Sequence, residues 1–161
     1  MKKFAIQSIL LLAVVAICLF LYFGSFFKGS TSFLSQSSSG QEVLINNDRI
    51  KVEVADNQDK RSKGLGGKPS IASDSGMLFV FDKEDKYPFW MKGMQFALDF
   101  IWISGPRVVD ISENVPAPIP GAPDSSLTIF SANTLVDKVL EVNAGTVKQL
   151  NIKVGDNIKL Q

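Results

Sequence analysis

The sequence predicts a mainly β domain, a compact sandwich or barrel-like fold with one or two short helices, preceded by one N-terminal transmembrane helix. Short apolar runs of strand length recur through residues 42–161, and turn-forming residues separate them. No regular alternation of strands with long helices is present, which disfavours a parallel α/β sheet. An uncharged hydrophobic run near the N-terminus predicts the transmembrane helix.

Residues 1–27 have the features of a membrane anchor. Residues 4–27 are a run of 24 residues without a charged side chain, and a helix of that length crosses a hydrocarbon core of about 30 Å. Lys2 and Lys3 precede the run and only Lys28 closely follows it. The positive-inside rule then places the N-terminus in the cytoplasm and the domain outside. A cleaved signal peptide is the alternative, but its apolar region is shorter and ends at small residues.

The next segment, residues 28–41, is rich in serine and glycine, which is typical of a flexible linker. We therefore expect a single-pass membrane protein whose extracytoplasmic domain occupies residues 42–161.

The first half of the domain begins with a hairpin, because a turn at residues 46–48 separates an apolar run from a strictly alternating one. A short helix over residues 58–63 follows, with Asp56 as its N-cap and Gly64 at its end. Residues 82–86 are charged and predict a loop. The strands expected here span residues 43–45, 50–54, 76–81, 89–95 and 96–103.

The second half is divided by a proline-rich loop over residues 116–123. A turn at residues 104–106 precedes it, and a helical turn at residues 146–150 with Asn151 as a left-handed cap follows it. A final hairpin turns at Gly155 and Asp156. The strands expected here span residues 108–111, 138–142, 152–154 and 158–160.

The composition limits the possible chemistry. The chain has no histidine, and its one cysteine, Cys18, lies inside the hydrophobic run. Catalytic triads, imidazole ligands and thiolate sites are therefore absent from the predicted domain, and we expect no cofactor and no metal centre there. All 16 acidic residues follow residue 40, whereas three of the 17 basic residues precede it. A domain with a net charge of −2 lacks the basic excess of a nucleic-acid binder.

The segment over residues 88–103 is the most unusual stretch, because it holds both tryptophans and two charges within apolar runs. Trp90 and Lys92 share one face of a strand, and Asp99 interrupts an apolar run. These residues could form a ligand pocket. Alternatively, Lys92 extends over Trp90 into water and Asp99 caps a bulge. If residues 89–102 form a hairpin, Lys92 and Asp99 face each other as a charge pair.

Two further polar groups are candidate sites. Asp110, Glu113 and Asn114 lie where a strand enters the proline-rich loop, and carboxylates there could hold a metal or act as acid and base. Glu141 and Asn143 lie two apart on one face of a strand, although Asn143 could simply cap the next helical turn.

Seven segments of the domain form a specific ordered series: residues 52–56, 61–65, 76–81, 89–92, 98–103, 139–145 and 152–156. In these segments and in their order the sequence resembles the prokaryotic DUF192 family, a domain of unknown function. Departures from the family pattern are Gly93, Ala97 and Asn151. The resemblance implies a sandwich-like β domain that often follows a signal peptide or anchor, and it implies no catalytic residues.

Three functions are consistent with these observations. We favour a membrane-tethered binding module for a small molecule, glycan or peptide, with Trp90, Lys92, Asp99, Glu113, Asn114, Glu141 and Asn143 as candidate ligand-binding residues. The first alternative is a hydrolytic enzyme that uses Asp99, Asp110 or Glu113, with or without a metal. The second is an accessory subunit of a membrane complex. The lack of histidine and cysteine in the domain favours binding over catalysis.

Overall fold

The computed structural model describes residues 40–161, which form one compact unit. The predicted anchor over residues 4–27 and nearly all of the predicted linker over residues 28–41 lie outside the described residues. Within residues 40–161, no helix is long and apolar enough to cross a membrane.

The described residues contain nine strands, which form a seven-stranded sheet and a two-stranded ribbon. The larger sheet has the order β6-β5-β8-β3-β2-β1-β9, and the ribbon pairs β4 with β7. All pairings in the larger sheet are antiparallel except β2 with β3. The strands are β1 Gln41–Ile45, β2 Asp48–Ala55, β3 Ser75–Asp85, β4 Phe89–Trp90, β5 Leu98–Ser104, β6 Arg107–Val115, β7 Ile129–Phe130, β8 Val136–Asn143 and β9 Ile158–Leu160.

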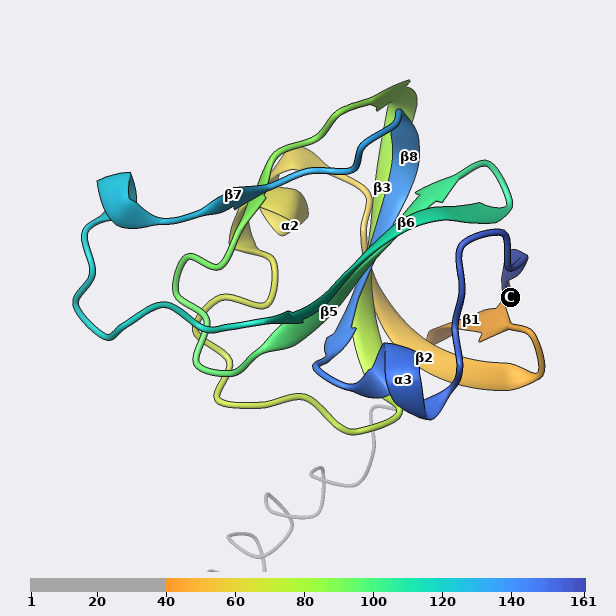
Figure 1. The fold of residues 1–161 in the computed structure, drawn as a ribbon, viewed down its shortest axis with the longest axis horizontal. Coiled ribbons are helices and arrows are strands. Elements are labelled where there is room, and N and C mark those ends of the chain that lie inside the picture. The colour runs from red at the N-terminus through yellow and green to blue at the C-terminus, as the bar shows by residue number, and fades with distance from the viewer. Residues whose placement is uncertain (1–39) are drawn as a thin grey trace, which may run out of the picture. The chain divides into compact units, whose positions relative to one another are not determined.

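The larger sheet curls into a half-barrel (Figure 1). Its two outer strands, β6 and β9, approach each other at one end, where Arg107 and Asn157 form an isolated bridge. The Ile158 N–H also donates to the Pro106 carbonyl at 2.8 Å. The mainly β prediction is therefore confirmed, in the form of a curled sheet rather than two stacked sheets.

The two faces of the sheet carry separate hydrophobic cores, because successive side chains of a strand point to opposite faces. On β5, Ile101 and Ile103 belong to the core on the inner face of the curl, whereas Phe100 and Trp102 belong to the core on the outer face. The helix α3 (Thr146–Gln149) contributes Val147 to the inner core. The helix α2 (Gln58–Lys63), its following loop and the β4–β7 ribbon lie on the outer side.

The predicted elements are largely present, with informative differences. The cap of α2 is Asn57, not Asp56, because the Asn57 Oδ1 accepts from the Lys60 N–H at 3.0 Å while Asp56 binds the Lys60 ammonium. The predicted loop at residues 82–86 is mostly strand, since β3 continues to Asp85 and pairs there with Val136. Here the charges mark an extension into solvent rather than the end of the strand.

The predicted strand over residues 89–95 is wrong beyond Trp90. Gly93 has a φ of +70°, and the Met94 N–H donates to the Met91 carbonyl in a tight turn. Met91 and Met94 are both buried, and a spacing of three residues does not fit the period of a strand.

The predicted C-terminal hairpin is also wrong. Residues 152–154 form no strand, and β9 pairs with β1 instead, in register Ile45 to Ile158. The curl of the sheet brings the end of the chain beside its first strand. The short β7 and the 3₁₀ helix η1 (Asp124–Ser126) were also not predicted from the sequence.

Candidate functional site

A cleft with a volume of about 800 Å³ opens on the outer side of the sheet. Four parts of the chain form its walls: α2 with the loop after it, the second half of β3, the segment from Tyr87 to Met94, and one residue of β8. The lining residues are Gln58, Arg61, Ser62, Lys63, Gly64, Leu65, Gly66, Phe79, Phe81, Asp82, Lys83, Tyr87, Pro88, Phe89, Trp90, Lys92, Gly93, Met94 and Glu141.

The carboxyl group of Glu141 belongs to the apolar outer face of the sheet. In the sheet register Glu141 lies between Met77 of β3 and Phe100 of β5, and side chains directly opposite each other point to the same face. Only 5% of Glu141 is exposed. Burial among apolar side chains disfavours the charged form and raises the pKa of Glu141 from 4.5 to about 8. The side chain is therefore mostly a neutral carboxylic acid near pH 7.

Glu141 has no hydrogen-bond partner among the side chains and backbone groups of residues 40–161. Within the described chain, every fully buried side-chain nitrogen or oxygen has a partner, so the Glu141 carboxyl must reach the cleft that it lines. An acid without a partner at the base of an apolar cleft is unusual, because buried polar groups are nearly always hydrogen-bonded.

The position of Glu141 depends on a glycine in the next strand. Gly76 pairs with Val142, and a Cβ atom at Gly76 would lie 2.4 Å from the Glu141 carbonyl oxygen. Only a residue without a side chain lets β3 approach β8 this closely, which explains the glycine at the start of a buried strand.

Aromatic rings form the apolar wall of the cleft. Phe79 and Phe89 pack edge to face with centroids 4.9 Å apart, and Phe81 stacks on Tyr87 with centroids 3.5 Å apart. Burial also raises the pKa of the Tyr87 hydroxyl, which donates to the Lys83 carbonyl. These pairs fix the rings in place and give the wall a defined form.

Basic side chains surround this wall. Arg61 of α2 lies over the Phe81 ring at 5.3 Å and donates to the Val80 carbonyl at 2.9 Å, so its guanidinium is held at the cleft. Lys63, Lys83 and Lys92 also line it, whereas Asp82 is the only acidic lining residue besides Glu141. Since Lys92 is paired with Asp124, the cleft has an excess of about two positive charges when Glu141 is neutral.

The structure brings together three of the predicted site residues, Trp90, Lys92 and Glu141. The side chain of Trp90 is 51% exposed, and the Lys92 ammonium lies over its ring at 5.5 Å. This arrangement confirms the alternative in which Lys92 extends over Trp90 into water.

The predicted pairing of Lys92 with Asp99 is wrong. Asp99 is fully buried on the inner face of the curl, where its Oδ1 accepts from the Asn114 N–H at 2.8 Å and its Oδ2 accepts from the Val147 N–H at 2.9 Å. Asn114 lies in a bulge of β6 with a φ of +54°, and Val147 lies in the first turn of α3. Asp99 therefore caps a bulge and a helix at once, and both oxygens are occupied.

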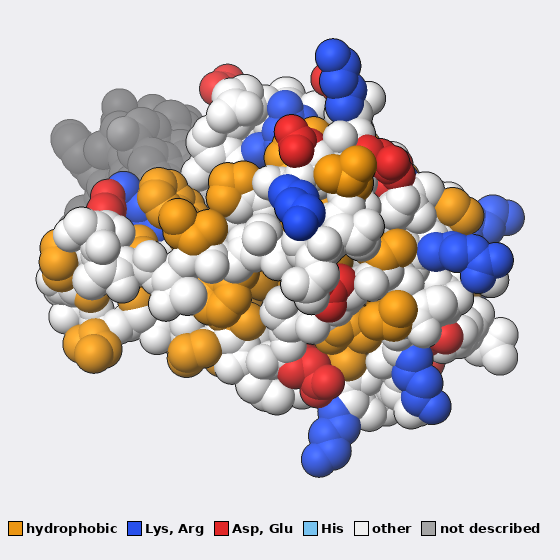
Figure 2. Space-filling view, turned by 45° about the horizontal axis from the view of Figure 1, so that its top comes forward, with side chains coloured by type: hydrophobic (Ala, Val, Ile, Leu, Met, Phe, Trp, Pro, Cys, Tyr) orange, Lys and Arg blue, Asp and Glu red, His pale blue; other side chains and the backbone are white. Residues whose placement is uncertain are grey.

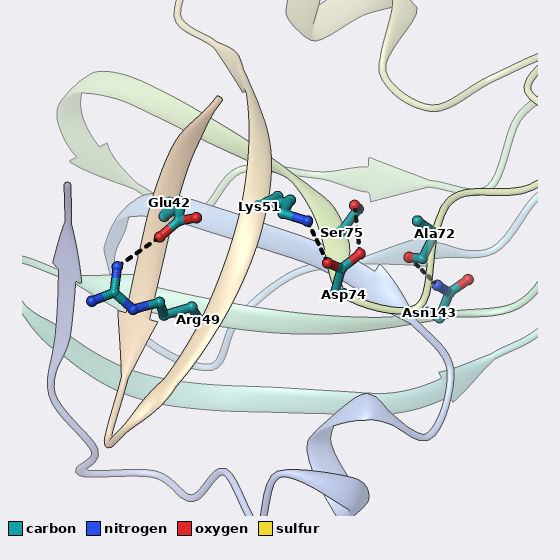
Figure 3. Close-up of polar contacts among 7 residues, drawn as sticks. All are labelled: Glu42, Arg49, Lys51, Ala72, Asp74, Ser75 and Asn143. Carbon is teal, nitrogen blue, oxygen red and sulfur yellow. Dashed lines mark hydrogen bonds and ion pairs between the residues drawn. The ribbon is translucent and has the colours of Figure 1, made fainter. Parts of the chain in front are cut away.

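The other predicted site residues do not line the cleft. Glu113 and Asn114 are exposed on β6, and Asp110 accepts two hydrogen bonds from Asn133. Asn143 does not cap α3; its side chain donates to the Ala72 carbonyl at 3.0 Å and ties down the loop before β3 (Figure 3). Within residues 40–161, no cluster of three or more carboxylates could hold a metal ion.

Seven polar lining residues were not predicted from the sequence: Gln58, Arg61, Ser62, Lys63, Asp82, Lys83 and Tyr87. Arg61 and Lys63 belong to a helix with no buried residue, which has the composition of a solvated surface. The available signal was the segment over residues 61–65, which carries part of the family resemblance and contains Gly64.

The fold and the cleft define a class of small proteins with a curled, mainly antiparallel sheet and an aromatic, basic cleft on its outer side. The family model of DUF192, described as "Uncharacterized ACR", matches residues 41–160, and the chain belongs to this family. No curated protein matches the chain.

Two solved structures resemble the domain. A proposed transcription regulator from Sinorhizobium meliloti 1021 has a TM-score of 0.65 at 29% identity, over 74% of this chain and 91% of that one. A protein of unknown function from Novosphingobium aromaticivorans DSM 12444 has a TM-score of 0.64 at 27% identity, over 73% of this chain and 83% of that one.

Proposed function

We propose that the domain is a binding module for a small molecule, which it holds in the cleft above Glu141, and that residues 4–27 tether it to the outer face of a membrane. The observation that carries the proposal is Glu141, which is 5% exposed, has no hydrogen bond to another residue of 40–161 and lines the cleft. A ligand group would supply the missing hydrogen bond.

The cleft has the features of a small-molecule site rather than a peptide groove. Its volume of about 800 Å³ falls within the usual range for small-molecule sites, roughly 300–1,000 Å³, and apolar and aromatic side chains dominate its wall. A few polar groups, chiefly Arg61, Lys92 and Glu141, would fix the orientation of the ligand.

The charge of the cleft favours a small anionic ligand, and the small extent of the basic region disfavours a nucleic acid. The basic excess is confined to the few side chains of the cleft. On the face shown in Figure 2, acidic and basic side chains lie among one another and among hydrophobic ones, without a continuous basic surface. A nucleic acid contacts many phosphates along an extended basic surface, so we do not extend the role suggested for the Sinorhizobium protein to this chain.

The binding test uses anilinonaphthalene sulfonate, a fluorescent probe with an apolar body and one negative charge. We expect saturable binding to the folded protein, weakened at least fivefold by Lys63→Glu or Lys92→Glu. Lys86→Glu is the matched control, because Lys86 is exposed and does not line the cleft. Equal effects of all three substitutions, or no saturable binding, would contradict the proposal.

The tether has its own test. The full-length chain should remain in the membrane fraction after carbonate extraction, and protease added outside the cell should digest the domain. A soluble mature form that begins near residue 30 would contradict it.

A hydrolytic enzyme is the second candidate, because an acid with a pKa of about 8 in a cleft suits a general acid at neutral pH. The residues would differ from those expected from the sequence, since Asp82 and Glu141 line the cleft and Asp99, Asp110 and Glu113 do not. Glu141→Gln distinguishes the candidates: it abolishes turnover by an enzyme, whereas it preserves binding by a module because the amide still donates a hydrogen bond.

A further inference from the structure

The base and the rim of the cleft differ in charge. The base is the outer face of the sheet, where Glu141 lies between Met77 and Phe100. The rim carries Arg61, Lys63, Lys83 and Lys92. A ligand that satisfies both regions needs two different polar groups joined by an apolar body.

We propose that the ligand is an organic anion with a flat apolar body, whose anionic group lies among the rim cations and whose opposite end presents a neutral hydroxyl or carbonyl oxygen to Glu141. This inference rests on the proposed binding function and specifies the class of ligand. The edge-to-face pair Phe79 and Phe89 supplies the apolar wall between the two polar regions.

The ligand group that contacts Glu141 at the base is neutral rather than cationic for two reasons. An ammonium that enters the cleft meets its excess of about two positive charges, which opposes it. Once at the base it would form a buried ion pair with Glu141, and the loss of hydration of both charges offsets most of their attraction. A hydroxyl avoids this penalty and can both accept from and donate to a carboxylic acid.

The surroundings of Glu141 support the same assignment. The titratable groups that line the cleft are Arg61 and Lys63 from α2, Asp82 and Lys83 from β3, and Tyr87 and Lys92 from the segment before and after β4. No hydrogen bond or ion pair within residues 40–161 joins any of them to Glu141, and burial alone accounts for its raised pKa.

The full-length chain is kept in a nonionic detergent, and calorimetry measures its affinity for three matched naphthoates. The probes are 2-naphthoate, 6-hydroxy-2-naphthoate and 6-(aminomethyl)-2-naphthoate. At the end opposite the carboxylate, the first carries no polar group, the second carries a neutral hydroxyl that can donate and accept, and the third carries a cation. We expect the hydroxyl compound to bind about fivefold more tightly than the unsubstituted one, and the aminomethyl compound to bind most weakly.

Two variants at the base show whether Glu141 causes this order. Glu141→Leu should remove the preference for the hydroxyl compound while binding of 2-naphthoate persists, and Glu141→Gln should keep at least half of that preference. Glu113→Gln, on the exposed part of β6, is the control and should change neither affinity.

The outcomes separate the two proposals. Tightest binding of the aminomethyl compound, or a hydroxyl preference that survives in Glu141→Leu, would overturn the assignment of the base while the cleft remains a binding site. If none of the naphthoates and no anilinonaphthalene sulfonate binds, the proposed function itself fails.

Discussion

The domain buries two carboxyl groups on opposite faces of one curled sheet, and their surroundings differ. Asp99 on the inner face accepts from two backbone N–H groups, at 2.8 and 2.9 Å. Glu141 on the outer face has no partner within the described chain, and burial raises its pKa to about 8. Burial alone therefore does not define a functional group. An acid whose oxygens are occupied supports the fold, whereas one that opens onto a cleft is available to a ligand.

Both carboxyl groups lie in the compact unit of residues 40–161. The stability measurements below therefore use the fragment from Gln41 to Gln161, which we expect to unfold in one cooperative step.

The largest effect is expected at Asp99. Asp99→Ala leaves the buried N–H groups of Asn114 and Val147 without an acceptor, and we expect it to lower the free energy of unfolding by about 2–5 kcal/mol. Denaturation in urea measures the loss. Glu113→Ala, at an exposed site on β6, is the control and should stay within about 0.5 kcal/mol. A loss below about 1 kcal/mol at Asp99 would show that its two hydrogen bonds do not stabilise the fold.

Glu141 should affect stability in the opposite direction and with a different pH dependence. Its pKa is higher in the folded protein than the ordinary value of 4.5, so the unfolded chain loses this proton first as the pH rises. The folded state is therefore destabilised progressively between about pH 4.5 and pH 8, and the loss levels off above that.

Glu141→Gln removes this pH dependence. Between pH 5 and pH 8 the stability of the variant relative to the unsubstituted fragment should rise by about 2–4 kcal/mol. Urea unfolding at several pH values measures the free energy of unfolding of both proteins. The pH dependence of the other titratable groups cancels in the difference between them. A constant difference across this range would mean that Glu141 titrates normally.

Gly76 tests how Glu141 is positioned. A Cβ atom there would lie 2.4 Å from the Glu141 carbonyl oxygen, so Gly76→Ala must separate β3 from β8. We expect a loss of about 1–3 kcal/mol together with weaker binding of anilinonaphthalene sulfonate. Ser75→Ala, one residue earlier, is the control. Unchanged stability and binding in Gly76→Ala would show that the two strands can move apart freely.

The smallest effect is expected at Lys92. Its ion pair with Asp124 is about half exposed on both sides, so the coupling energy from a double-mutant cycle of Lys92→Ala and Asp124→Ala should be below about 1 kcal/mol. Lys92→Ala and Asp99→Ala should be additive, because the two side chains do not pair. A coupling of 2 kcal/mol or more between positions 92 and 99 would contradict the hydrogen bonds found for Asp99.

Local sequence patterns predicted the elements that neighbouring residues in the chain determine. The alternation at residues 50–54, the turn at Gly105 and the left-handed Asn151 all appear in the structure. The capped bulge at Asp99 was one of three interpretations of a charge in an apolar strand, beside a ligand pocket and a pair with Lys92. The pair with Lys92 failed because Gly93 turns the chain before a hairpin can form.

The cleft could be predicted only in part, because distant segments form it. Trp90, Lys92 and Glu141 stood out as polar or aromatic residues in apolar runs, and all three line it. Arg61 did not stand out, since its role depends on the packing of α2 against Phe81 of β3. The sequence also did not show that Asp99 faces the inner core and Glu141 faces the cleft. Strand register decides which face of a curled sheet a residue occupies.

The most direct test of the account is a carbon-13 NMR titration of the side-chain carboxyls, with the Glu141 signal assigned by its loss in Glu141→Gln. Glu141 should titrate with a midpoint near pH 8, and its signal should change when 6-hydroxy-2-naphthoate is added. A midpoint near the ordinary value of 4.5, with no response to the ligand, would contradict it.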